Sequence, residues 1–107
     1  YRSWWADYPD PENFLAPLFE SEVSKKRWTR YENLDLDNMI EKLQTETNHQ
    51  KRINIAQNAN DILKEDAPWI YLWHMQSAIV TQHNLKNWSP SVMFNAEKYH
   101  KVAKHKP

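Results

Sequence analysis

The residues best suited to binding chemistry stand near the start of the chain. Trp4 and Trp5 come just before Asp7, and Pro9 stiffens the turn that follows. A carboxylate at the end of a strand, beside flat aromatic surface, suits a positively charged and partly apolar small molecule. On residue types alone, Asp7 could instead brace the turn before Pro9. Both interpretations stay open at this point.

Other kinds of site chemistry find little support in the residue types. The chain has five histidines without metal-ligand spacing, and no cysteine for a thiolate or a disulfide. It has no glycine, so a Rossmann or P-loop phosphate-binding loop is excluded. No Ser/His/Asp constellation stands out. We therefore predict no metal site, no cofactor and no catalytic residue, and an enzyme is the least favoured class.

The charge balance argues against nucleic acid as a partner. Basic and acidic residues number 14 each, so no overall field attracts a polyanion or an anionic membrane. A short basic cluster, Lys25–Arg27 with Arg30, lies near Trp28 and Tyr31. We interpret residues 20–34 as an irregular, solvated surface loop. No apolar run approaches the roughly 20 residues that span a bilayer.

Three helices are expected to position these residues. Asp10 before Pro11 is a strong helix start, and Pro17 should shorten or distort that helix. Residues 35–47, capped by Asp35, and residues 49–65, capped by Asn48, each carry an apolar stripe. Together these two read as an αα-hairpin. The stripes are, in order, Phe14, Leu15, Leu18 and Phe19; Leu36, Met39, Ile40 and Leu43; Ile55, Ala56, Ala59, Ile62 and Leu63.

Short strands complete the expected elements. Residues 1–6 are rich in aromatics, residues 69–73 read as a buried strand, and residues 77–82 as a further one. The tail from residue 98 to 107 reads as an exposed end. Without glycine, positive backbone φ should fall to asparagine or aspartate, with Asn33, Asn84, Asn87 and Asn95 as candidates.

Residues 3–11 read Ser-Trp-Trp-Ala-Asp-Tyr-Pro-Asp-Pro, and Phe14-Leu15 follow. Further on stand Tyr31, Asn33, Asp37 and Arg52, and then residues 65–72, Glu-Asp-Ala-Pro-Trp-Ile-Tyr-Leu. This ordered series resembles the C-terminal portion of the family 5 solute-binding proteins of ABC importers. The family pattern is Gly-Trp-x-Ala-Asp-Tyr-x-Asp-Pro, then Phe-Leu, and Ser3 takes the place of its glycine.

The resemblance implies roles for particular residues. In peptide binders of this family, the aspartate matching Asp7 accepts the α-amino group of the bound peptide. Trp4 and Trp5 match positions that flank the ligand, and strand alternation favours Trp4 over Trp5 for the cleft. Trp73 and His74 lie near a second contact region, where core packing is an equal alternative. For Asp10, Asp66 and Arg52 we expect structural roles: a helix cap, a turn residue and an ion pair.

The resemblance also implies a fold: an α/β C-terminal fragment of a two-lobed, type II periplasmic-binding-protein-like receptor, with short strands and three helices. Residues 1–76 would belong to the ligand-binding lobe, and residues 77–107 would cross the hinge to the other lobe. The receptor would be extracytoplasmic, either periplasmic or lipid-anchored at the outer face of the cell membrane. It would capture oligopeptides and deliver them to membrane permease subunits. The chain alone, without the remainder of the receptor, is expected to bind peptide poorly.

Three alternatives remain. The same family includes binders of other cargoes, such as a nickel complex, haem or a sugar. An aromatic-rich carbohydrate-binding module would use exposed, coplanar Trp4, Trp28 or Trp88. A structural fragment would pack its helices against a partner chain.

Overall fold

The structure is a computed structural model that describes residues 3–27, 29–74, 76, 78–91, 93 and 97–104. The chain divides into two compact units. Pro9–Tyr71 forms one, here called the helical unit. Tyr1–Tyr8 and Leu72–Pro107 together form the other, here called the aromatic unit. The expected lobe boundary after residue 76 concerns the larger receptor and stays a prediction.

The helical unit begins with α1 (Glu12–Phe19) and α2 (Ser21–Arg27). Asp10 Oδ1 accepts the backbone N–H of Glu12 at 2.9 Å, so the helix starts where it was expected, although its N-cap residue is Pro11 and Asp10 stands one residue earlier. Pro17 lies inside α1, which has 8 residues and ends at Phe19. The prediction of an irregular loop over residues 20–34 is wrong where α2 forms. The buried residues of α2 are polar, Ser21 and Ser24, so its sequence has no apolar stripe that would predict a helix.

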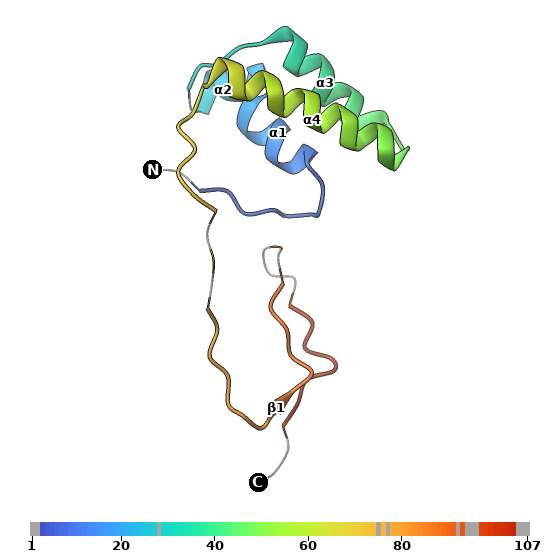
Figure 1. Cartoon of the computed structure of the whole chain (residues 1–107), viewed down its shortest axis with the longest axis vertical. Helices are drawn as coiled ribbons and strands as arrows, with labels where there is room; N and C mark the ends of the chain where they lie inside the picture. Colours follow the sequence, from blue (N-terminus) through green and yellow to red (C-terminus); the bar gives the residue numbers. More distant parts are fainter. Residues whose placement is uncertain are drawn as a thin grey trace. The chain divides into compact units, whose positions relative to one another are not determined.

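The predicted αα-hairpin is confirmed as α3 (Leu34–Thr45) and α4 (His49–Asp66), which pack side by side in Figure 1. Asn48 caps α4 as expected, through the N–H of Lys51. The cap of α3 is Asn33, whose side chain accepts the N–H of Leu36. The prediction of Asp35 as cap is wrong, because Asp35 already lies within the first turn.

The core of the helical unit is formed by α1, α3 and α4. The most enclosed apolar side chains, each exposed by 2% or less, are Leu36, Ile40, Leu43, Ala59 and Leu63. On α1, Leu15, Leu18 and Phe19 are buried, whereas Phe14 is 44% exposed. The apolar stripes therefore located most of the core, and α1 packs against α3 to cover the hairpin.

The predicted strands do not form in the described residues. Residues 3–6, 69–74, 76 and 78–82 have no strand structure. The sheet that the structure does show is the antiparallel pair β1 (Leu85–Lys86) and β2 (Ala103–Lys104), with Leu85 opposite Lys104. The tail from residue 98, predicted to be an exposed end, is mostly exposed in its described residues, and β2 pairs it with β1. Helices with one small sheet are compatible with an α/β fragment, and the two-lobed parent fold stays a prediction.

Positive φ angles correct another expectation. Asn87 has φ of 58°, as predicted, but Arg30 and Ala67 also adopt positive φ, at 57° and 43°. Asn33 is extended, with φ of −151°. Asn84 is not among the positive-φ residues, and Asn95 lies outside the described residues. Ala67 follows the last turn of α4, where a left-handed residue closes many helices.

Candidate functional site

The five predicted ligand-contact residues fall in two segments of one unit. Trp4, Trp5 and Asp7 lie in Tyr1–Tyr8, and Trp73 and His74 lie in Leu72–Pro107. Both segments therefore belong to the aromatic unit, although more than sixty residues separate them in the chain. The contribution of these residues to a ligand site stays a prediction.

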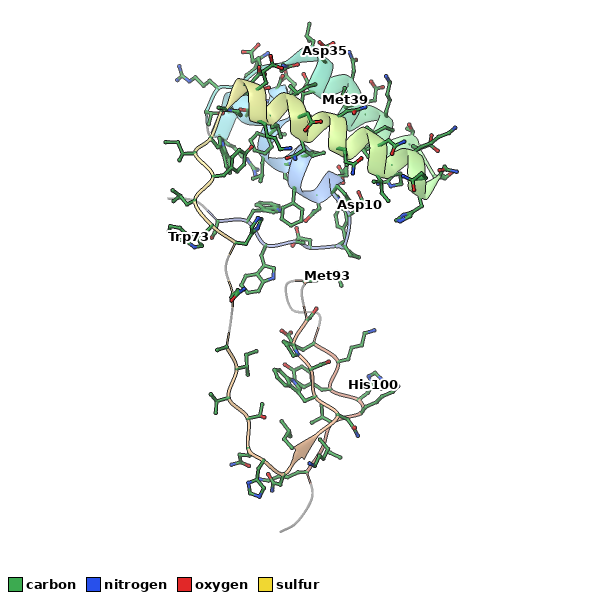
Figure 2. The ribbon with its side chains drawn as sticks, in the orientation of Figure 1. Asp10, Asp35, Met39, Trp73, Met93 and His100 are labelled. Carbon is green, nitrogen blue, oxygen red and sulfur yellow. The ribbon has the colours of Figure 1, made fainter. Side chains whose placement is uncertain are left out.

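The exposure of these side chains is suited to binding from solution. Asp7 and His74 are exposed, Trp4 is half-buried, and Trp5 and Trp73 are 51% and 66% exposed. Figure 2 labels Trp73 on the segment that follows α4. The preference for Trp4 over Trp5 was based on strand alternation, and residues 3–6 form no strand. That preference therefore loses its structural basis.

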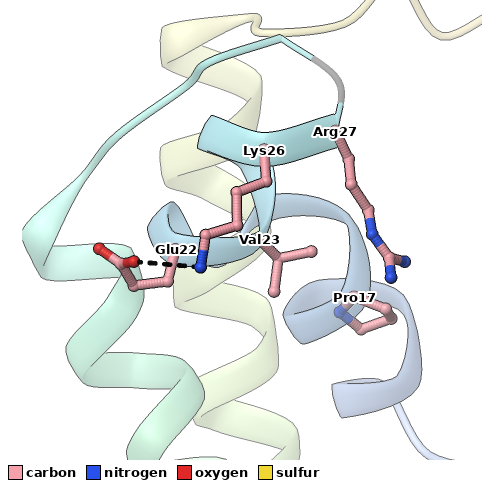
Figure 3. Close-up of a pocket in the computed structure, with 5 residues that line it drawn as sticks. All are labelled: Pro17, Glu22, Val23, Lys26 and Arg27. Carbon is pink, nitrogen blue, oxygen red and sulfur yellow. Dashed lines mark ion pairs between the residues drawn. The ribbon is translucent and has the colours of Figure 1, made fainter.

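A hollow of about 320 Å³ lies elsewhere, on the helical unit (Figure 3). It is lined by Pro17 of α1 and by Glu22, Val23, Lys26 and Arg27 of α2. Lys26 Nζ lies 3.8 Å from Glu22, so one cation beside the hollow is already paired. None of the predicted ligand-contact residues lines it, and nothing in its lining favours a particular ligand.

The motif residue Arg52 joins three parts of the helical unit. Its Nη2 lies 2.7 Å from Asp10 Oδ2, before α1, and Nη1 donates to the carbonyls of Leu43 and Glu46 at the end of α3. Figure 2 shows Asp10 at the turn that leads into α1. The prediction that Arg52 makes a structural ion pair is confirmed. A guanidinium can satisfy several such acceptors at once because it carries five donors.

A second joint brings together Tyr31, Asn33 and Asp66. Asp66 Oδ2 accepts hydrogen bonds from the Tyr31 hydroxyl and, at 2.8 Å, from Asn33 Nδ2. The Tyr31 hydroxyl and the Asn33 amide hold the pKa of Asp66 below its ordinary value. Burial, and then the bond to Asp66, raise the pKa of Tyr31. Asp66 was expected to be a turn residue; it is instead the last residue of α4 and an anchor for the segment before α3.

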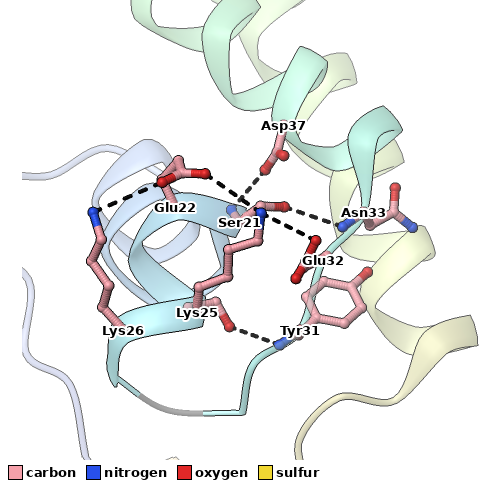
Figure 4. Close-up of polar contacts among 9 residues, drawn as sticks. Ser21, Glu22, Lys25, Lys26, Tyr31, Glu32, Asn33 and Asp37 are labelled. Atoms are coloured by element: carbon pink, nitrogen blue, oxygen red, sulfur yellow. Dashed lines mark hydrogen bonds and ion pairs between the residues drawn. The ribbon is translucent and has the colours of Figure 1, made fainter.

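The neighbouring polar contacts hold α2 against α3, as Figure 4 shows. Ser21 N donates to Asp37 Oδ1 at 2.9 Å, and the N–H groups of Asn33 and Tyr31 donate to Ser21 Oγ and Ser24 Oγ. The motif residues Tyr31, Asn33 and Asp37 are therefore tied into the scaffold. Sequence reasoning missed these pairings, since no local pattern relates residues so far apart in the chain.

The contacts of Lys25, in the same region, bear on whether the basic cluster is a solvated surface or an RNA contact. It lies 3.2 Å from Glu32 and 3.5 Å from Glu22, and the Glu32 hydrogen bond and charge raise the pKa of Lys25. With Lys26 also near Glu22, two of the basic residues are balanced by carboxylates. This pairing agrees with a solvated surface and gives no support to RNA binding.

In the described part of the chain, no group of three or more histidine, cysteine, aspartate or glutamate residues could hold a metal ion. No helix there is both long enough and apolar enough to cross a bilayer.

Comparison with known proteins gives three partial similarities. The chain is 32% identical over 72 residues to heme-binding protein A of Haemophilus influenzae, 66% of this chain and 13% of that protein. It is 26% identical over 105 residues to probable di/tripeptide-binding protein 5 of Pseudomonas aeruginosa, 96% of the chain and 20% of the protein. It is 30% identical over 83 residues to oligopeptide-binding protein OppA of Bacillus subtilis, 78% of the chain and 15% of the protein.

These similarities are low in identity and cover a small share of each relative. The chain spans between 13% and 20% of the length of these proteins. No family model matches the chain, and no solved structure matches it significantly. The chain is thus similar to parts of proteins named for binding a solute, either haem or peptides, and none of the three is named as an enzyme.

Proposed function

We propose that the chain is part of a family 5 solute-binding protein, the receptor component of an ABC peptide importer. The observation that carries the proposal is the similarity over 105 residues, nearly the whole chain, to a protein named for binding di- and tripeptides. A second relative is named for oligopeptides. In this role the receptor works outside the cytoplasm and delivers its peptide to permease subunits in the membrane.

Asp7 is proposed to accept the ammonium group of the peptide. Its carboxylate is exposed, and the half-exposed ring of Trp5 belongs to the same segment. A charge-assisted hydrogen bond of this kind contributes roughly 1.5–3 kcal/mol once water is excluded. Trp4, Trp5, Trp73 and His74 are proposed to supply the surrounding surface, with aromatic faces that accept varied side chains.

Haem is the competing cargo, and one observation favours it. The relative with 32% identity over 72 residues is named heme-binding protein A. The aromatic rings of Trp5 and Trp73 could cover a flat macrocycle as well as a peptide side chain. Peptides remain the first choice, because two of the three relatives are named for them.

Direct titration separates the two cargoes. The longest natural chain that contains this sequence is titrated with Ala-Ala-Ala and with a mixed pentapeptide by calorimetry, and with haemin by absorbance. We expect submicromolar peptide binding without a saturable haem band. Saturable haem binding with no heat from peptides would assign the haem cargo. The absence of binding in both titrations would refute the proposal.

A further inference from the structure

The chain passes between the two units at two places, after Tyr8 and after Tyr71. Near each crossing, within the helical unit, an aspartate side chain is hydrogen-bonded to a residue far away in the sequence. Asp10 is two residues from the first crossing, and Asp66 is five residues from the second. Beyond these crossings lie the proposed ligand-contact segments, which hold Asp7 on one side and Trp73 on the other.

The first anchor is Asp10, which uses both of its carboxylate oxygens. Oδ1 accepts the N–H of Glu12 at 2.9 Å, and Oδ2 lies 2.7 Å from Arg52 Nη2, on α4. The side chains of Asp10 and Arg52 are only 27% and 21% exposed, so water screens the pair less than an open surface pair. The residues that follow the first crossing are thereby tied to both α1 and α4.

The second anchor is Asp66, together with the residues that follow it. Tyr31 and Asn33 hold the carboxylate, and Ala67 then turns the chain in the left-handed conformation, at φ 43° and ψ 51°. That conformation is costly for alanine, so surrounding contacts must maintain it. Three residues after Asp66, the ring of Trp69 lies 4.9 Å from that of Phe19. The stretch leading to the second crossing is therefore pinned at two points.

We propose that Asp10 and Asp66 are positioning residues for ligand binding. Each ligand-contact segment extends from a stretch of chain that one of these carboxylates fixes to the helical unit. Neither carboxylate touches the ligand itself. The inference rests on the proposed function. It assigns the motif residues Tyr31, Asn33 and Arg52 a shared task, since each holds one of the two carboxylates.

Hydrogen exchange of the 107-residue chain tests the anchors without a ligand. In Asp66→Ala we expect the amide of Ala67, which donates to Leu63 O, to exchange about tenfold faster. In Asp10→Ala the same acceleration is expected at Glu12, whose amide donates to Asp10 Oδ1. Asp61→Ala is the matched control, because that carboxylate on α4 is exposed and contacts the exposed side chain of Lys64. Unchanged exchange beside the anchors, or a uniform increase across all helices, would overturn the proposal.

Tyr31→Phe offers a milder variant, which removes only the hydroxyl bonded to Asp66. It keeps the aromatic ring, so folding is retained even where Asp66→Ala proves too disruptive. Faster exchange at Ala67 is expected in this variant as well. Exchange at the wild-type rate there would count against the Asp66 anchor.

Peptide binding by the longest natural chain tests the positioning role. Asp10→Ala and Asp66→Ala are expected to weaken tripeptide binding about tenfold, and Asp61→Ala to leave it unchanged. Ile40→Val, 1% exposed and far from both anchors in sequence, serves as a control for general loss of stability. If it lowers the melting temperature equally and weakens binding equally, the role is merely structural. If the wild-type protein binds no peptide, the proposed function fails. The hydrogen-exchange rates then decide separately whether Asp10 and Asp66 fix the neighbouring backbone to the helical unit.

Discussion

The helices of the helical unit bury more of their large apolar side chains than the aromatic unit does. In the helical unit, Leu36 and Leu43 are fully buried. In the aromatic unit, Leu72, Trp73 and Val80 are 60%, 66% and 96% exposed. A helix makes its backbone hydrogen bonds within one segment, whereas a strand requires a neighbour. The difference shows that helices can form from hydrogen bonds within one segment. The apolar runs that were predicted as strands would need a neighbouring strand, and the described residues do not provide one.

The sharpest test of this contrast is a pair of leucine truncations. Leu43→Ala removes a side chain with 0% exposure, so we expect a loss of about 2–5 kcal/mol in unfolding free energy. Leu72→Ala, at 60% exposure, should change it by less than about 0.5 kcal/mol. Urea unfolding followed by circular dichroism at the helix band measures both. Equal losses of unfolding free energy in the two variants would contradict the burial of Leu43 and the exposure of Leu72.

Removal of Arg52 tests the polar joint inside the helical unit. Arg52→Ala leaves Asp10 and two helix-end carbonyls without this donor, so we expect a loss of about 1–3 kcal/mol. Lys51→Ala is the matched control, since Lys51 is 70% exposed and lies 3.9 Å from Glu46. Its loss should stay below about 0.5 kcal/mol. Thermal melts of the two variants should separate clearly, and coincident melts would refute this role for Arg52.

Two alanines of the helical unit should respond to glycine in opposite directions. Ala67 has a left-handed backbone, so Ala67→Gly should raise the unfolding free energy by about 0.5–1 kcal/mol. Ala59 is fully buried within α4, and Ala59→Gly should lower it by about 1 kcal/mol or more. Chemical denaturation compares the two. A loss in both variants would mean that Ala67 is not held in this conformation.

The smallest expected effect is the pH dependence from Asp66. Because its pKa is lowered in the folded chain, its contribution to stability is present above the ordinary carboxyl value, and is lost as pH falls through the folded pKa. The stability difference between wild type and Asp66→Asn should therefore shrink from neutral pH to about pH 2–3. Urea midpoints along a pH series give this difference. A gap that stays constant in acid would contradict the Tyr31 and Asn33 contacts.

The sequence predicted the elements whose pattern is local. The stripe from Leu36 to Leu43, the Asn48 cap and the Asp10 helix start were all recognisable within a few residues. Helix α2 was missed because its buried residues are serines. In the described residues the predicted strands do not form, because apolar runs specify a tendency without specifying a partner strand.

The candidate site shows the same limit. Arg52 was expected to form an ion pair, but its partner Asp10 lies 42 positions away, beyond any local pattern. The contact between Tyr31 and Asp66 spans 35 positions. The ligand roles of Asp7 and Trp73 came from motif resemblance, and they remain predictions because they depend on a ligand.

The central claim is that Asp7 receives the amino terminus of a peptide, and one measurement tests it most directly. Calorimetry compares a free and an N-acetylated tripeptide on the longest natural chain, as wild type, Asp7→Asn and the control Asp61→Asn. We predict that Asp7→Asn weakens the free peptide about tenfold to a hundredfold and leaves the already weak acetylated peptide unchanged. The control should match wild type. Equal losses for both peptides would contradict the account and assign Asp7 a structural role.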